Sequence, residues 1–267
     1  MRLVSFDSFR TLGFEGLEYV KPELMHRHLD LLREADWVLY PEYWQVNSLV
    51  YGLGARVFPS LASYHLGHNK IEMTRYFQLV APANIPDTLI LPNTPAGQQE
   101  VLDYFPFPFV AKKAKSSRGE GVYLIQSRRQ FEEYCAEVDV LYAQEFLPID
   151  RDLRLVVIGE KVVGGYWRVR SDGGFHNNVA QGGEIVMGLL PEAAVTLVER
   201  LARQAGINHA GFDIAMVGNY PFVFEFNRLF GNQGVSELGL DLPKLIMEYL
   251  SRQTPRHPPV ATDQQLA

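Results

Sequence analysis

The stretch 209–234 contains three side chains whose types and spacing suit a metal site. Two strand-like runs meet at a turn at residues 217–220; Asp213 lies in the first run, and Glu225 and Asn227 lie in the second. Residues two apart in a strand point to the same face, and the hairpin can bring Asp213 alongside them. Two carboxylates and an amide oxygen suit Mg²⁺ when the ion shares its shell with nucleotide phosphates.

An acidic hairpin end facing solvent is the simpler interpretation, because short carboxylate patterns are common. The neighbours of Glu225 argue against it, since Phe222, Val223, Phe224 and Phe226 are all apolar. A carboxylate in such a largely buried run needs a partner or a metal. The hairpin therefore predicts a metal-binding role.

A second pattern joins a lysine to a glycine loop. Lys112 lies in an expected strand just before the loop 115–121, which contains Ser117, Gly119 and Gly121. Glycine lets backbone N–H groups approach phosphate oxygens, and the lysine adds a point charge. An ordinary hairpin has the same appearance and stays open as an alternative. The loop is not a P-loop, because GxxxxGK[ST] is absent, and not a dinucleotide fingerprint, because a strand follows the glycines.

A third pattern lies at the end of another expected strand, formed by Gln144, Glu145, Phe146 and Leu147, with Asp152 shortly after it. An acid with apolar neighbours at a strand end suits a hinge against adenine, and Asp152 could then reach a ribose hydroxyl. A plain strand edge is the alternative, and the sequence alone does not reject it.

Two arginines and several amides follow. Arg168 and Arg170 share one strand face, and the loop after them contains Asn177, Asn178 and Gln181. Planar guanidinium groups suit two-point contacts with phosphate or carboxylate. A solvated strand face is the alternative for either arginine.

Composition excludes several classes of protein. The chain has 267 residues, 47% hydrophobic and 21% charged, with a net charge of −6. It contains no basic block, so nucleic acid is not the expected partner. The single cysteine, Cys135, allows no disulfide within the chain and fits a reducing cytosol. No signal-like or membrane-spanning apolar run occurs, which predicts a cytoplasmic protein with no membrane partner.

The remaining elements predict an α/β and α+β protein in four parts. Strands and helices alternate in residues 1–65, which predicts a parallel sheet. The expected parts are a small α/β domain at 1–68, a lobe with a connector helix and the glycine loop at 69–147, a lobe with the hairpin at 148–251, and a proline-rich tail at 252–267.

The ordered set of these residues resembles the ATP-grasp superfamily, most closely its RimK-like, glutamate ligase-type branch. The likeness extends from about residue 67 to residue 234, and its members are Lys70, Lys112, the glycine loop, Gln144, Glu145, Arg168, Asn178, Asp213, Glu225 and Asn227. The resemblance implies the ATP-grasp fold, in which two α+β lobes clasp ATP and a pre-ATP-grasp α/β domain precedes them.

The resemblance also implies roles toward the nucleotide. Lys70, Lys112 and the glycine loop would contact the phosphates, residues 144–147 would form the adenine hinge, and Asp152 would meet the ribose.

Further implied roles concern the metal and the reacting groups. Asp213, Glu225 and Asn227 would hold Mg²⁺, with Mn²⁺ as an alternative. Arg168 would meet the transferred phosphoryl group or an acyl phosphate, and Asn178 would assist at the phosphates or the metal.

The sequence departs from the family pattern in two places. Many relatives have Pro-Gly three positions after the metal asparagine, where this chain continues with residues 228–231, Arg-Leu-Phe-Gly. Relatives of the glutamate ligase type often have a basic residue at the position of Gln181. Both positions lie where a substrate is expected, and recognition of a substrate carboxylate by Arg228 is one hypothesis.

The resemblance implies an ATP-dependent carboxylate–amine ligase that acts through an acyl phosphate on small-molecule or peptide substrates. The alternatives are an ATP-grasp kinase, an acid–thiol ligase, or a non-catalytic nucleotide-binding regulatory protein. Relatives are often dimers or tetramers, so a homo-oligomer is compatible with the family.

Overall fold

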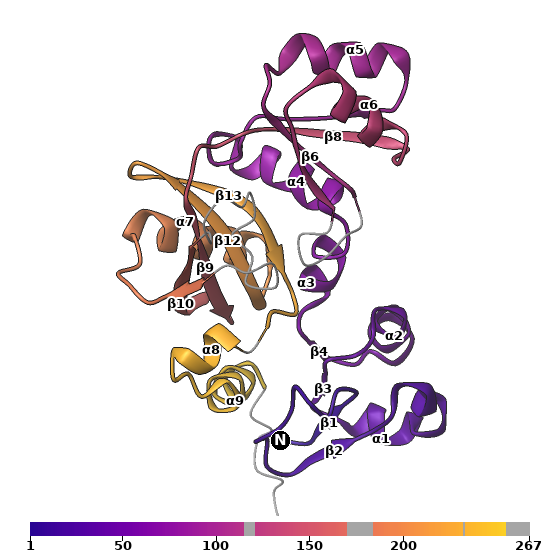
Figure 1. Cartoon of the computed structure of the whole chain (residues 1–267). Helices are drawn as coiled ribbons and strands as arrows, with labels where there is room; N and C mark the ends of the chain where they lie inside the picture. Colours follow the sequence, from indigo (N-terminus) through magenta and orange to yellow (C-terminus); the bar gives the residue numbers. More distant parts are fainter. Residues whose placement is uncertain (115–120, 170–183, 232, 255–267) are drawn as a thin grey trace, which may run out of the picture. The chain divides into compact units, whose positions relative to one another are not determined.

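The structure is a computed structural model that describes residues 1–114, 121–169, 184–231 and 233–254 (Figure 1). Its contacts divide the chain into two compact units, Met1–Phe58 with Asp241–Ala267, and Pro59–Leu240. Within the described residues, the first unit holds one β-sheet and the second holds two. None of the helices in these ranges combines the length and the apolarity that a membrane span requires.

The sheet of the first unit consists of short parallel strands in the order β2-β1-β3-β4, which confirms the parallel arrangement expected there. Its strands are β1 (Leu3–Ser5), β2 (Leu17–Tyr19), β3 (Trp37–Leu39) and β4 (Val57–Phe58). Its helices are η1 (Pro22–Arg27), α1 (Leu29–Glu34), α2 (Tyr43–Asn47), η2 (Ser48–Gly52) and α9 (Leu242–Gln253). Helices η1 and α1 are separated at His28, whose φ of −121° and ψ of 28° are not helical.

Helix α9 groups with the first unit, although it was expected in the 148–251 lobe. The Asp241 side chain caps it by accepting a hydrogen bond from the Lys244 N–H at 3.0 Å. Just beyond its end, Thr254 Oγ1 accepts a hydrogen bond from Trp37 Nε1 in β3 at 2.9 Å. The four-part domain division stays a prediction.

The smaller sheet of the second unit is antiparallel, in the order β5-β8-β6-β7. Its apolar face packs on α5 and α6 through side chains such as Val101, Phe109 and Phe131. The elements of this part are α3 (Leu61–Leu66), α4 (Lys70–Val80), η3 (Pro82–Asn84), β5 (Thr88–Pro92), α5 (Pro95–Tyr104), β6 (Phe109–Lys112), β7 (Val122–Ile125), α6 (Arg128–Cys135) and β8 (Val140–Glu145).

The larger sheet is also antiparallel, in the order β11-β10-β9-β12-β13. Gly159 and Gly218 adopt φ angles of 67° and 60° in the turns of the β9–β10 and β12–β13 hairpins. The left-handed region favours glycine because it has no Cβ. The elements are β9 (Arg151–Ile158), β10 (Lys161–Val169), β11 (Glu184–Val186), α7 (Glu192–Ala205), β12 (His209–Val217), β13 (Tyr220–Asn227) and α8 (Gln233–Glu237).

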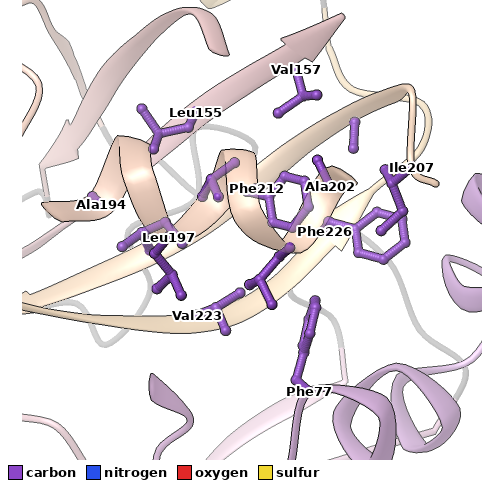
Figure 2. Packing of buried hydrophobic residues seen from close by; sticks show 14 of the residues in the cluster. Phe77, Leu155, Val157, Ala194, Leu197, Ala202, Ile207, Phe212, Val223 and Phe226 are labelled. Atoms are coloured by element: carbon purple, nitrogen blue, oxygen red, sulfur yellow. The ribbon is translucent and has the colours of Figure 1, made fainter. Parts of the chain in front are cut away.

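In the middle of the larger sheet, apolar side chains alternate with polar ones along the strands. Leu155, Phe212 and Phe226 point to the face that α7 covers, where Leu197 of α7 and Phe77 of α4 join the same buried cluster (Figure 2). The intervening residues of the same strands face the other way, and they include the buried charged residues Asp152, Arg154 and Asp213. Since side chains alternate across a strand, one apolar face fixes the sheet and leaves the opposite face for the functional residues.

Candidate active site

The polar face of the larger sheet carries a row of side chains in register across four strands. Tyr166 of β10 pairs with Arg154 of β9, Arg154 pairs with Asp213 of β12, and Asp213 pairs with Glu225 of β13. The expectation that Asp213 lies alongside Glu225 is thereby confirmed. A bulge directly after Asp213 shifts the register of the β12–β13 pair.

A buried ion-pair network surrounds Asp213. Arg154 donates to it from Nε and, at 3.1 Å, from Nη2 to Oδ2. Arg168 lies 3.1 Å from Asp213 Oδ1 through Nη2, and its Nε donates to Asp152 Oδ1 at 2.6 Å. The side chains of these four residues are at most 11% exposed. Two guanidinium groups therefore alternate with two carboxylates, and each charge has a partner.

This network shifts the affinities of its members for protons. Burial raises the pKa of Asp152, although neighbouring Arg168 opposes that effect. Burial alone would lower the pKa of Arg168, but Asp213 and Asp152 outweigh it and raise the pKa above its ordinary value. Arg168 therefore stays cationic at the centre of the polar face.

Sequence reasoning missed Arg154, because it lies inside the otherwise apolar run 153–158. The available signal was its spacing: Asp152 and Arg154 are two apart in a strand and so share a face. Arg168 was expected at a transferred phosphoryl group and Asp152 at a ribose. The structure brings the two side chains together on this face, and those two roles stay predictions.

Glu225 lies between two lysines that come from different parts of the second unit. Lys70, the first residue of α4, donates to Glu225 Oε2 at 2.7 Å. Burial by itself would raise the pKa of Glu225, but Lys70 and Lys112 lower it to about 2. Asn227 Nδ2 lies 3.5 Å from Glu225 Oε1. Glu225 is therefore ionised at neutral pH, as a cation ligand must be.

Lys112 ends β6 and is buried, with 6% of its surface exposed. Its Nζ lies 5.4 Å from the ring centroids of both Tyr142 and Phe224. Burial lowers the pKa of Lys112 to about 8, with the charge of Glu225 opposing the shift. A phosphate group beside Lys112 would supply the negative charge that favours its protonated form.

The donor set of the hairpin fits a hard divalent cation such as Mg²⁺, since Asp213, Glu225 and Asn227 offer two carboxylates and an amide oxygen on one face. In the ranges the structure describes, no group of three His, Cys, Asp or Glu side chains forms a metal site. The set of Asp213, Glu225 and Asn227 contains only two residues of these four types, because its third member is an asparagine. Both oxygens of Asp213 contact Arg154, so a cation bound there would share Asp213 with the arginines.

The expected adenine hinge ends β8, the strand next to β5. Gln144 is buried and donates from Nε2 to Thr88 Oγ1 at 2.8 Å. Glu145 Oε2 accepts from the Asp87 N–H at 3.2 Å, and Leu147 is buried just beyond the strand. These contacts fix the end of β8, directly before Phe146, and the contact with adenine stays a prediction.

Part of the expected site falls outside the described residues. Gly121 is described, and its carbonyl oxygen accepts a hydrogen bond from the Lys113 N–H at 2.8 Å. The positions outside are Ser117, Gly119, Arg170, Asn177, Asn178 and Gln181.

Solved structures with the same fold identify its class. A RimK-domain ATP-grasp protein from Sphaerobacter thermophilus aligns with a TM-score of 0.68 over 94% of this chain and 100% of that chain, at 18% identity. A D-alanine–D-alanine ligase from Bacillus anthracis aligns with a TM-score of 0.69 over 95% and 98%, at 14% identity. The chain therefore has the ATP-grasp fold, as the order of its motifs predicted.

Sequence comparison narrows the class to a family. The model of the RimK-like ATP-grasp domain matches residues 71–250. A probable alpha-L-glutamate ligase of Legionella pneumophila strain Corby is 33% identical over 156 residues, 55% of this chain and 51% of that protein. The chain belongs to the RimK-like ATP-grasp domain family, and it spans about half the length of the curated relatives it matches.

Proposed function

We propose that this protein is an ATP-dependent carboxylate–amine ligase that acts through an acyl phosphate. The carrying observation is the convergence on one polar face of three acidic or amide ligands, Asp213, Glu225 and Asn227, with the cationic Lys70 and Arg168. Such a face neutralises both the phosphates of a nucleotide and a carboxylate that attacks them. Membership of the family supports the same activity.

The proposed chemistry has two steps. A carboxylate oxygen attacks the γ-phosphorus of ATP, and the bond to the β-phosphate oxygen breaks to release ADP. The nitrogen of an amine then attacks the acyl carbon, inorganic phosphate leaves with the electron pair of the C–O bond, and the nitrogen loses a proton. No protein group forms a covalent bond, so catalysis rests on positioning and charge.

Each residue has a role in that scheme. Lys70 and Lys112 bind the phosphates, and Arg168 stabilises charge on the transferred phosphoryl group. Asp213, Glu225 and Asn227 would hold Mg²⁺, which supplies charge neutralisation when bound. Residues 144–147 bind adenine and Asp152 contacts the ribose. Asn178 and the glycine loop assist at the phosphates.

The substrates we propose are a small-molecule or peptide carboxylate and an amine. The name of the Legionella pneumophila relative points to glutamate as the first amino acid to test. Because the chain spans about half of such relatives, the panel should extend to other amino acids, dipeptides and small dicarboxylic acids.

The test is ADP release from Mg·ATP across this panel, with mass spectrometry of the products. ADP that appears only with both an acid and an amine, together with a condensed product, is the expected result. A product heavier by one phosphoryl group would instead identify a kinase. Nucleotide binding without turnover across the panel would favour a non-catalytic regulatory protein.

A further inference from the structure

A cavity of about 390 Å³ lies between the start of α4 and the residues that follow β13. Its described lining includes two strongly basic side chains, Lys70 and Arg228, and contains no aspartate or glutamate. Lys70 has its partner in Glu225 at 2.7 Å. Among the ion pairs of the described residues, none includes Arg228, so its positive charge in this cavity is not neutralised by a carboxylate.

Arg228 is held at both its main chain and its side chain. Its carbonyl oxygen accepts a hydrogen bond from His209 Nδ1 at 2.6 Å, and the His209 ring stacks on Phe230 with centroids 4.7 Å apart. Its guanidinium carbon lies 4.7 Å from the ring centroid of Tyr64, which is fully buried. A cation over an aromatic face is attracted to it and held there. Arg228 is therefore oriented by the protein itself.

One donor of this oriented group has nothing to bind. Within the described ranges, Nε of Arg228 is buried and lacks a hydrogen-bond partner. Buried polar atoms nearly always have one, so the exception calls for an explanation. The planar guanidinium presents Nε–H and a neighbouring Nη–H in the spacing of the two oxygens of a carboxylate. An acid ligand in the cavity would neutralise the charge, and it would satisfy Nε–H once the side chain turned to expose that donor.

We propose that the cavity binds a free carboxylate of an amino-acid substrate, the one that the ligation leaves intact, with Arg228 as its specificity-determining residue. This inference rests on the proposed ligase function. An amino acid that reacts through its amine keeps its α-carboxylate. That carboxylate needs a cation other than the residues proposed to bind ATP. Arg228 supplies this cation, and it directly follows the predicted metal ligand Asn227 in the chain.

The experiment measures binding by isothermal titration calorimetry, with the protein saturated by Mg²⁺ and a non-hydrolysable ATP analogue. The probes are the common amino acids, glutamate first, each compared with its α-carboxamide. We expect the parent protein to bind at least one acid about tenfold or more tightly than its amide. Arg228→Ala should weaken binding of that acid by about 10- to 100-fold and leave binding of the amide unchanged, and Arg228→Lys should fall between the two.

Arg151→Ala is the matched control. Arg151 also lies over an aromatic ring, that of Trp167, with its guanidinium carbon 4.7 Å from the centroid. It points to the opposite face of β9 from Asp152, because the two are adjacent in the strand. The control should retain the preference for the acid. Melting temperature and affinity for the nucleotide analogue establish that each variant is folded.

Several results would overturn the proposal. The first is that the parent binds every acid and its amide equally, or binds none of them. The second is an unchanged affinity for the acid in Arg228→Ala. The third is a loss of nucleotide affinity in that variant, which would assign Arg228 to a phosphate. Product analysis of the parent separates the two proposals. If the parent protein condenses its substrates but Arg228 has no role in acid binding, only the inference about Arg228 is wrong. If Arg228 binds the acid but the parent protein forms no condensed product, the proposed ligase function is wrong.

Discussion

Around Arg154 and Asp213, the two faces of the larger sheet are almost equally buried and chemically opposite. On the face that α7 covers, Leu155 and Phe212 are fully buried among apolar side chains. On the other face, the side chains of Arg154 and Asp213 are only 8% and 9% exposed, and each contacts an opposite charge. These residues alternate along the same strands, β9 and β12, so burial alone does not reveal which face is functional.

The difference teaches how the sheet divides its tasks. Burial of apolar surface on the α7 face contributes most of the stabilisation, because it removes that surface from water at no cost in desolvated charge. Ion pairs on the polar face lose much of their attraction to desolvation, so they are a weak source of stability. What they provide is fixed positions for charged groups, which a phosphoryl-transfer site requires.

The largest expected effect separates catalysis from stability. Glu225→Gln should lower turnover by about a thousandfold or more, because it removes a predicted metal ligand, and should shift the melting temperature by only a few degrees. Steady-state ADP release with the cognate substrates measures the first effect and calorimetry the second. Glu199→Gln is the control, since Glu199 belongs to α7 and pairs with Lys161 at 2.8 Å. Parent-like activity of Glu225→Gln would remove the metal role.

The next effect concerns the apolar face. Phe212→Ala should destabilise the protein by about 3–5 kcal/mol, because its ring packs against Phe77 and Phe226 at centroid distances of 6.5 and 5.3 Å. Urea unfolding measures the change. Val217→Ala in the same strand should cost less than about 0.5 kcal/mol, since Val217 is 40% exposed. Equal losses in the two variants would contradict the assignment of the core to this face.

A third effect tests how much the buried charge of Lys112 lowers the free energy of unfolding. The folded pKa of Lys112, about 8, lies below its ordinary 10.5 because of burial. The unfolded chain then binds more protons between pH 8 and pH 10.5, so this residue's destabilisation is full below pH 8 and disappears as the pH rises to 10.5. The shift corresponds to about 3 kcal/mol at most.

Lys112→Met should therefore be more stable than the parent at pH 7, by up to about 3 kcal/mol, and the gain should shrink toward pH 10. Urea unfolding of both proteins without nucleotide or metal gives the two differences. A gain of the same size at both pH values would show that removal of charge is not its cause.

The smallest effect probes how closely the polar row is packed. A Cβ at Gly211 would lie 2.7 Å from Arg154 Nη1 and 3.1 Å from Phe230 Cβ, so Gly211→Ala must shift the Arg154 side chain, which contacts Asp213. We expect a loss of about 1–3 kcal/mol in the free energy of unfolding. Gly231→Ala is the control, because a Cβ there would meet no described atom within 4 Å. A neutral Gly211→Ala would show that Arg154 relocates without cost.

Sequence reasoning predicted the features that depend on local pattern. The β12–β13 hairpin and the pairing of Asp213 with Glu225 are confirmed, because a short turn fixes which strands meet. The partnership of Arg154 with Asp213 was missed, since the two are 59 residues apart in the chain and only the order of the strands brings them together. The short elements β2, β11, α3 and α8 were also missed, because three to six residues carry little periodic signal.

The return of α9 to the first unit has a consequence for the order of events on the ribosome. The β1–β4 sheet is made from residues 1–58, while the helix that belongs to the same unit is translated only after residues 59–240. At about 5–20 residues per second, the intervening segment takes roughly 10–40 s to synthesise. During that interval Trp37 lacks its partner Thr254. The second unit can thus fold before the first is complete, so residues 1–58 reach their final structure only after a segment that is translated later than they are.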